Sequence, residues 1–150
     1  MDRKEIIQII IAIILFGIIL SFSELLSSNF SYLGTGILFA FIIIITNILA
    51  KKLMASKLDA GVKHEIWHWK RFGYRPHQHL SKPIPLGAIL PLFISAFSLG
   101  FIKFSAILTY ETSALKRRAA KRHGYLSFTE MTDKHNASIG AAGILATLLL

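Results

Sequence analysis

Four long apolar runs, separated by polar and basic segments, organise this chain. They cover about residues 6–23, 30–50, 83–102 and 137–150. A membrane-spanning helix needs roughly 20 predominantly apolar residues, and the first three runs reach about that length. The pattern therefore predicts an all-α polytopic membrane protein, formed as one membrane-embedded domain over residues 1–150. We expect about three to four transmembrane or re-entrant helical segments, with minor strand in the polar loops.

The first run has one alternative interpretation. Arg3 and Lys4 precede it, as basic residues precede the apolar part of a secretory signal. However, it is longer than the usual 7–15-residue apolar region, and Glu24-Leu25-Leu26 follows it where a small-residue cleavage site would be needed. We interpret it as a retained anchor, with a cleaved signal as the alternative.

The third run contains residues that interrupt a helix. Pro85, Gly87, Pro91 and Gly100 lie in or beside it, and basic segments flank it on both sides. Proline and glycine break helix continuity, and irregular backbone is tolerated at membrane depth only inside protein or beside water. A re-entrant hairpin, or a pair of short helices, fits better than one crossing. A single span is the alternative.

Charge sets the expected orientation. The chain is 53% hydrophobic, carries a net charge of +9 and contains no cysteine, so disulfides and thiolate sites are excluded. Lysine and arginine gather between the second and third runs and between the third and fourth. By the positive-inside rule, these segments and the N-terminus are cytoplasmic, and the Glu24 loop lies outside. We expect an integral protein of a prokaryotic cell membrane that contacts lipid headgroups and does not bind nucleic acid.

The segment between the second and third runs carries the chemistry. Apolar residues recur there at helical spacing: Leu53, Leu58, Val62, Ile66 and Trp69. This spacing predicts a helix from Lys51 to Phe72, which continues the second run or resumes after a short break and ends at the turn 73–76. The sequence His64-Glu65-Ile66-Trp67-His68 lies on it. On a helix, residues at i and i+4 share a face, so both imidazoles could bind one Zn²⁺.

This HExxH pattern predicts zinc-dependent peptide hydrolysis. His64 and His68 would be metal ligands, and Glu65 would take a proton from a zinc-activated water and pass it to the leaving amine. A catalytic zinc site needs a third protein ligand, and the sequence supplies no obvious one. Asp59 lies off the histidine face, whereas a later polar segment could fold back with three weak candidates: Glu130, Asp133 and His135.

Three smaller patterns are open to two interpretations each. His77-Gln78-His79 places two imidazoles on one face of an extended chain, although a solvated loop is the simpler interpretation. Four aromatic residues around the motif are most simply an interfacial anchor: Trp67, Trp69, Phe72 and Tyr74. The alternation from Tyr125 to Phe128 hints at a short strand.

Together these residues resemble the site-2 protease family of intramembrane zinc metalloproteases, in its divergent archaeal-type form. The likeness covers roughly residues 36 to 150. It rests on the HEIWH motif after an apolar span, then Arg71-Phe72-Gly73-Tyr74, the Pro/Gly-marked apolar segment and Ser138 to Gly143. Only HEIWH is a specific motif. The resemblance implies zinc as cofactor and transmembrane proteins or peptides as substrates.

The resemblance also implies a third ligand that the sequence does not show. In that family both histidines of the motif and an Asp in a later Asp-Gly turn hold the zinc, which matches His64 and His68 here and makes Glu65 the base. The Asp-bearing motif has no counterpart, because Leu150 falls inside what resembles the preceding helix. We therefore expect a chain truncated at its C-terminus. Trp67 is also bulkier than the family's usual small residue.

Three functions stay open from the sequence. The first is an intramembrane zinc metalloprotease or its N-terminal portion. The second is a non-catalytic membrane protein that binds transmembrane segments. The third is a small structural membrane protein in which HEIWH is a coincidence. A transporter is disfavoured, because the apolar runs contain almost no ionisable residue.

Overall fold

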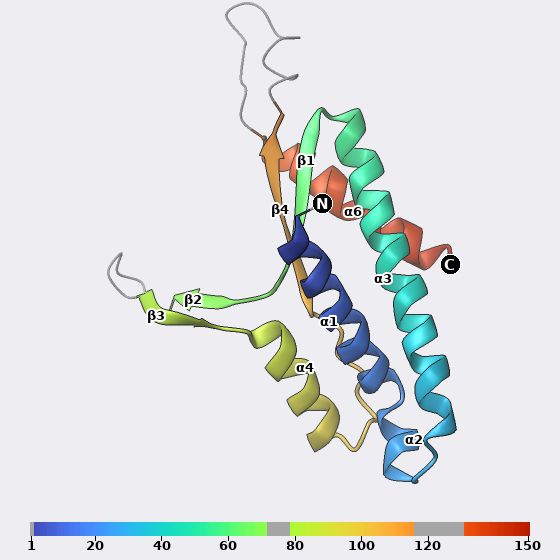
Figure 1. Ribbon diagram of the computed structural model, residues 1–150. Helices are drawn as coiled ribbons and strands as arrows, with labels where there is room; N and C mark the ends of the chain where they lie inside the picture. Colours follow the sequence, from blue (N-terminus) through green and yellow to red (C-terminus); the bar gives the residue numbers. More distant parts are fainter. Residues whose placement is uncertain (1, 72–78, 116–130) are drawn as a thin grey trace, which may run out of the picture. The chain divides into compact units, whose positions relative to one another are not determined.

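The computed structural model describes residues 2–71, 79–115 and 131–150 (Figure 1). Five helices and four strands lie within these ranges. The helices are α1 (Arg3–Leu20), α2 (Phe22–Leu26), α3 (Ser31–Lys57), α4 (Leu86–Phe97) and α6 (Asp133–Leu148). The strands are β1 (Ala60–Ile66), β2 (Trp69–Arg71), β3 (His79–Ile84) and β4 (Leu108–Ala114).

The fold is mixed α/β, and the prediction of an all-α polytopic protein is wrong. Among the described residues, helix accounts for 62% and strand for 17%, and the strands form two small antiparallel sheets. Each apolar run does contain a helix, but α4 has only 12 residues and α6 only 16. Within the described ranges, α3 alone is long and apolar enough to cross a bilayer. Helix α1 has 18 residues, of which Arg3, Lys4 and Glu5 are charged.

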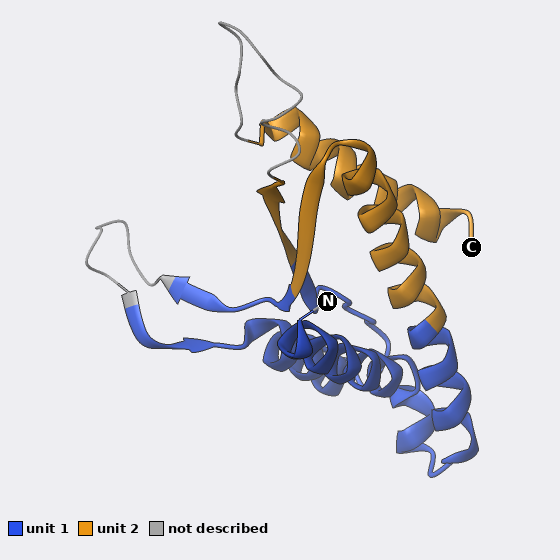
Figure 2. Ribbon diagram, turned by 45° about the horizontal axis from the view of Figure 1, so that its top comes forward, with its two compact units in different colours: residues 1–41, 65–109 blue, residues 42–64, 110–150 orange. Residues whose placement is uncertain are grey.

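The chain forms two compact units (Figure 2). Unit 1 contains residues 1–41 and 65–109, and unit 2 contains residues 42–64 and 110–150. Helix α3 and strand β1 therefore each contribute residues to both units.

In unit 1, helices α1 and α3 approach closely at glycines. A Cβ atom on Gly17 would lie 2.7 Å from Cγ1 and 2.8 Å from Cα of Ile37. A Cβ atom on Gly36 would lie 2.9 Å from the Gly17 carbonyl oxygen. Small residues at helix contacts let backbones pack closely, as is common between membrane helices. The Ser21 hydroxyl, just after α1, donates to the Tyr32 carbonyl oxygen at 3.1 Å.

The core of unit 2 lies between one end of α3, strand β1 and helix α6. Its buried residues are Ala55, Ala60, Val62 and Ile139, with partly buried neighbours around them: Met54, Leu58, Tyr110 and Met131. This cluster covers the inward face of β1. It fixes which side of that strand is buried.

The helix predicted over residues 51–72 continues only to Lys57, and strand β1 takes its place over Ala60–Ile66. Helix α3 ends at Lys57, and Asp59 turns the chain with a φ of 50°, a conformation that Asp tolerates better than most residues. Burial then alternates from Ala60 to Ile66. Val62 and Ile66 are four residues apart, a spacing that fits a helical face and also a strand face. Pairing with β4 decides between them, and that partner lies more than 40 residues away in sequence.

Candidate functional site

The HEIWH motif begins in strand β1 and ends beyond it. His64, Glu65 and Ile66 are the last residues of the strand, whereas Trp67 and His68 follow it. The predicted helical face, with both histidines one turn apart, is therefore wrong. Successive side chains of a strand point to opposite faces. His64 is thus buried on one face, and Glu65 is half-buried on the other.

His64 lies on the core side of unit 2 with only 1% of its surface exposed. The Leu115 amide donates to the Asp59 carbonyl oxygen at 3.2 Å, and Gly61 lies beside Ser113. These contacts pair Asp59 with Leu115 and Gly61 with Ser113 in an antiparallel register. Continued along the two strands, the same register places His64 opposite Tyr110. Directly opposed residues present side chains to the same face. The Nε2 atom of His64 is buried and has no hydrogen-bond partner among the described residues, although another interaction of this residue exists.

A polar network surrounds Tyr110 within unit 2. Its hydroxyl donates to the Asn136 carbonyl oxygen at 3.0 Å, and the Thr112 hydroxyl donates to the side-chain oxygen of Asn136. The Nζ atom of Lys51 lies 4.6 Å from the Tyr110 ring centroid. On the same side of α3 as Lys51, the Asn47 side-chain amide donates to the Gly143 carbonyl oxygen at 3.1 Å. Strand β4 and helices α3 and α6 thus meet through polar contacts near His64.

The sequence pattern does not single out these residues. Lys51 is one of the basic residues that follow the second apolar run, and Tyr110 and Asn136 lie far from the motif in sequence. One available signal was the position of Asn47 and Lys51, which lie four residues apart in a long apolar segment. Polar residues at i and i+4 share a helix face, and when that face is buried each of them needs a polar partner.

Trp67, within the motif, joins three segments of unit 1 through its backbone. Its amide donates to the Ile107 carbonyl oxygen at 3.0 Å, and its carbonyl oxygen accepts from the Gly87 amide at 2.8 Å. A Cβ atom on Gly87 would lie 2.9 Å from the Trp67 amide nitrogen and would also overlap the Ile107 carbonyl oxygen. Only glycine leaves room for this contact. The motif is therefore attached to the start of α4 and to Ile107, the residue before β4.

The described residues do not form a complete zinc site. They contain no group of three or more His, Asp or Glu side chains placed to hold a metal ion. Three of the proposed third ligands are described and join no such group: Asp59, Asp133 and His135. His135 instead shares a hydrogen bond with the Thr132 hydroxyl at the start of α6. Glu130 lies outside the described residues.

Several smaller predictions fall wholly or partly outside the described residues. His77 and Gln78, Phe72 and Tyr74, the turn 73–76 and the segment 125–128 belong to the stretches that are not described. Trp69 does lie in β2, where it pairs with Ile84 of β3. Between Trp69 and Arg71 the register shifts, as at a β-bulge.

Comparisons with known proteins add no relative: no protein-family model, curated protein or solved structure matches this chain.

Proposed function

We propose that this chain is an integral membrane protein of the zinc metallopeptidase type, or part of one, and that it hydrolyses peptide bonds in membrane proteins. The observation that carries the proposal is the place of the HEIWH motif. It begins seven residues after α3, the helix long enough to cross a bilayer, and its Trp67 backbone holds the apolar segment that contains α4. Ionisable residues kept beside apolar membrane helices are costly and are typically functional.

The burial of His64 supports the same proposal. Fully buried polar side chains need satisfied interactions to offset lost hydration, and a histidine with 1% exposure is retained in the core of unit 2. Imidazole nitrogens are common zinc ligands. When bound, zinc polarises the scissile carbonyl and makes a water nucleophilic at neutral pH. His64 and His68 are the proposed ligands.

Two parts of such a site are not brought together by the described residues. Glu65 faces away from His64 across β1, and a third ligand does not join the histidines. The role of Glu65 as the base therefore rests on the motif and not on this geometry, and Glu65→Gln tests it. The proposal requires a ligand from outside the described residues, such as Glu130 or a segment of another chain.

The test is zinc content and proteolysis of the chain purified in lipid nanodiscs. We expect about one zinc per chain, lost in His64→Ala, and cleavage of a transmembrane peptide that is abolished in Glu65→Gln. Glu111→Gln is the matched control, because Glu111 is an exposed carboxylate on β4. Equal cleavage by Glu65→Gln and wild type, or no zinc in the wild type, would overturn the proposal.

A second candidate is a non-catalytic membrane protein that binds transmembrane segments. The observation that favours it is the alternation of His64 and Glu65 across β1, which separates a ligand from a base. In that case a labelled transmembrane peptide would bind in nanodiscs and stay intact. Glu65→Gln would then leave binding unchanged.

A further inference from the structure

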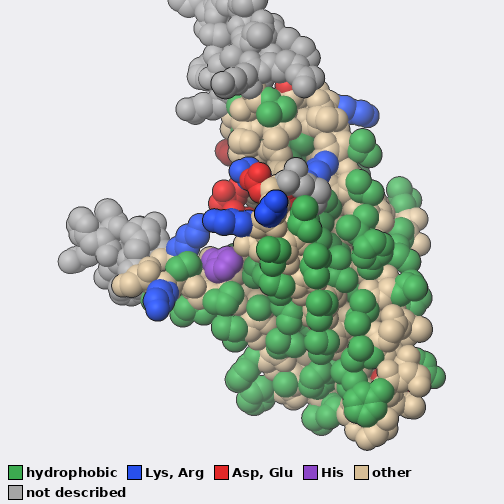
Figure 3. All heavy atoms as spheres, viewed as in Figure 1, with side chains coloured by type: hydrophobic (Ala, Val, Ile, Leu, Met, Phe, Trp, Pro, Cys, Tyr) green, Lys and Arg blue, Asp and Glu red, His purple; other side chains and the backbone are tan. Residues whose placement is uncertain are grey.

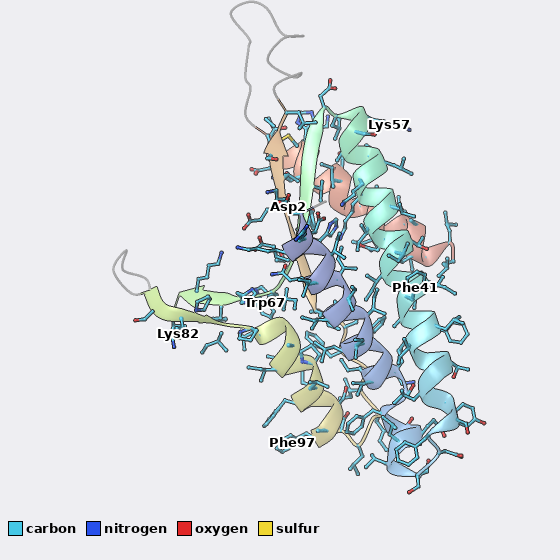
Figure 4. The ribbon with its side chains drawn as sticks, in the orientation of Figure 1. Asp2, Phe41, Lys57, Trp67, Lys82 and Phe97 are labelled. Carbon is cyan, nitrogen blue, oxygen red and sulfur yellow. The ribbon has the colours of Figure 1, made fainter. Side chains whose placement is uncertain are left out.

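The segment from Leu86 to Ile107 leaves one point of unit 1 and returns to it. The Gly87 amide and the Ile107 carbonyl oxygen both bond to the backbone of Trp67, at 2.8 and 3.0 Å. Helix α4 forms the outward limb, and residues 103–107, which belong to no helix or strand, form the return limb. Figure 4 shows Trp67 near the start of α4 and Phe97 at its other end. The segment is therefore a hairpin, and not a single crossing of unit 1.

The outward limb is too short to cross a bilayer as a helix. At about 1.5 Å per residue, its 12 residues extend about 18 Å, against a hydrocarbon thickness of about 30 Å. The chain reverses at Leu99 and Gly100, whose φ angles are 52° and 83°. A Cβ atom on Gly100 would lie 2.7 Å from the Ser23 amide nitrogen. The tip of the hairpin thus packs against α2.

Helix α4 has one face inside the unit and one outside. Gly87, Pro91 and Ser95 are buried, and α4 packs against α1. The opposite face exposes large apolar side chains: Ile89 by 49%, Phe93 by 60% and Phe97 by 76%. The rings of Phe93 and Phe97 lie 4.5 Å apart, centroid to centroid. Residues 83–102 contain no charged residue.

This apolar surface continues onto the other helices of unit 1. Isoleucine side chains are exposed on α1, and leucine and phenylalanine side chains are exposed on the first part of α3. They are Ile7, Ile10, Ile14, Leu38, Phe39 and Phe41. In Figure 3, hydrophobic side chains gather over the region of α1 and α4. An apolar surface of this extent indicates a nonaqueous environment or a partner. Since α3 is long and apolar enough to cross a bilayer, the occupant that fits is lipid.

The return limb differs from α4 in its chemistry. Lys103 and Ser105 are exposed, and the limb belongs to no helix or strand of the described residues. Its Ile107 amide donates to the Ser105 carbonyl oxygen at 2.8 Å, in a tight turn. Irregular backbone cannot face hydrocarbon, because its amide and carbonyl groups would lose hydrogen bonds; at membrane depth it must lie in protein or beside water. The exposed residues of this limb therefore require water.

We propose that the hairpin Leu86–Ile107 is a two-sided membrane element. The exposed face of α4 contacts the acyl chains of bilayer lipids, while the return limb faces water, and Trp67 holds both ends. This inference does not depend on the proposed peptidase activity.

The chain contains no cysteine, so single-cysteine variants report accessibility without a background. The α4 variants are Phe93→Cys and Phe97→Cys, and the return-limb variants are Lys103→Cys and Ser105→Cys. All four positions are exposed in the protein, so burial within this chain cannot distinguish them. The full chain is placed in nanodiscs of phosphatidylcholine and phosphatidylglycerol and treated with a water-soluble maleimide.

We expect the two α4 cysteines to react about tenfold or more slowly than the return-limb cysteines, because thiols in apolar surroundings form little thiolate. In SDS all four should react at similar rates. A fluorophore on Phe97→Cys should also be quenched by brominated acyl chains, whereas one on Ser105→Cys should not. Equal reactivity of α4 and the return limb in nanodiscs, or no quenching at Phe97→Cys, would overturn the proposal.

Discussion

The Nζ atom of Lys51 lies 4.6 Å from the centroid of the Tyr110 ring, joining α3 to β4 within unit 2. The same tyrosine donates its hydroxyl to the Asn136 carbonyl oxygen of α6 and faces His64 across the β1–β4 ladder. One side chain therefore links three elements around the first histidine of the motif. Each contact can be removed separately.

Tyr110→Phe should remove the hydroxyl hydrogen bond and keep the ring. We expect a loss of about 1 kcal/mol in the free energy of unfolding, or roughly 2–4 °C in Tm for a chain of this size. Tyr110→Leu should lose about 0.5–2 kcal/mol more, because the cation–π contact with Lys51 also disappears. Thermal denaturation in detergent measures both. If Tyr110→Leu were no less stable than Tyr110→Phe, the Lys51 contact would contribute nothing.

Gly17→Ala should weaken the contact between α1 and α3. The added methyl group would lie 2.7 Å from Cγ1 and 2.8 Å from Cα of Ile37, and the backbone atom cannot move aside without shifting the helix. We expect a destabilisation of about 1–3 kcal/mol, as for other overpacked sites.

The matched control is Gly34→Ala in α3, where the added methyl group meets no atom within 4 Å. This variant should gain about 0.5–1 kcal/mol, since alanine favours helix over glycine. Both variants are compared by thermal denaturation in the same detergent. A lower Tm for Gly17→Ala together with a higher Tm for Gly34→Ala would support the close packing of α1 against α3 at Gly17. Equal changes in Tm would contradict it.

Gly87→Ala should open the base of the hairpin at Trp67. Its methyl group would overlap the Ile107 carbonyl oxygen and lie 2.9 Å from the Trp67 amide nitrogen. We expect faster hydrogen exchange at the amides of Trp67 and Gly87, because both of their hydrogen bonds lie at this contact. Mass spectrometry of the exchanged chain measures this change. Unchanged exchange there, with wild-type Tm, would show that the contact is not required.

Added zinc should stabilise the wild type if the proposed ligands bind it. A ligand that binds only the folded state adds about 2.7 kcal/mol at 100 times its Kd, so Tm should rise and fall again with a chelator. His64→Ala should abolish the rise. His135→Ala is the control, because that histidine already bonds to Thr132 and should leave the rise intact. A similar rise in Tm for His64→Ala would mean that zinc binds at another site.

The β1 segment shows why periodicity alone predicted a helix where a strand forms. Ala60, Val62, His64 and Ile66 are all buried, a spacing of two, but Val62 and Ile66 also fit a helical face. The apolar residues that continue the pattern from α3 made the helix appear unbroken. Asp59 at a positive φ and hydrogen bonds to a distant strand end it instead.

The third apolar run contains the proline and glycine residues that predict a re-entrant hairpin: Pro85, Gly87, Pro91 and Gly100. The chain does reverse at Leu99 and Gly100, whereas entry of this segment into a membrane stays a prediction. In the structure Gly87 closes its base and Gly100 its tip. The attachment of this segment to Trp67 could not be predicted, because backbone hydrogen bonds between distant residues leave no pattern in residue type or spacing.

By itself, the sequence determined that each of the four apolar runs contains a helix and that the chain is strongly apolar and basic. Those properties depend on local composition and on neighbours within a turn or two. The tertiary structure decided that His64 and Glu65 occupy opposite faces of a strand, that Tyr110 lies beside His64, and that Trp67 holds both ends of the hairpin. These depend on backbone hydrogen bonds between residues far apart in sequence, which local patterns do not encode.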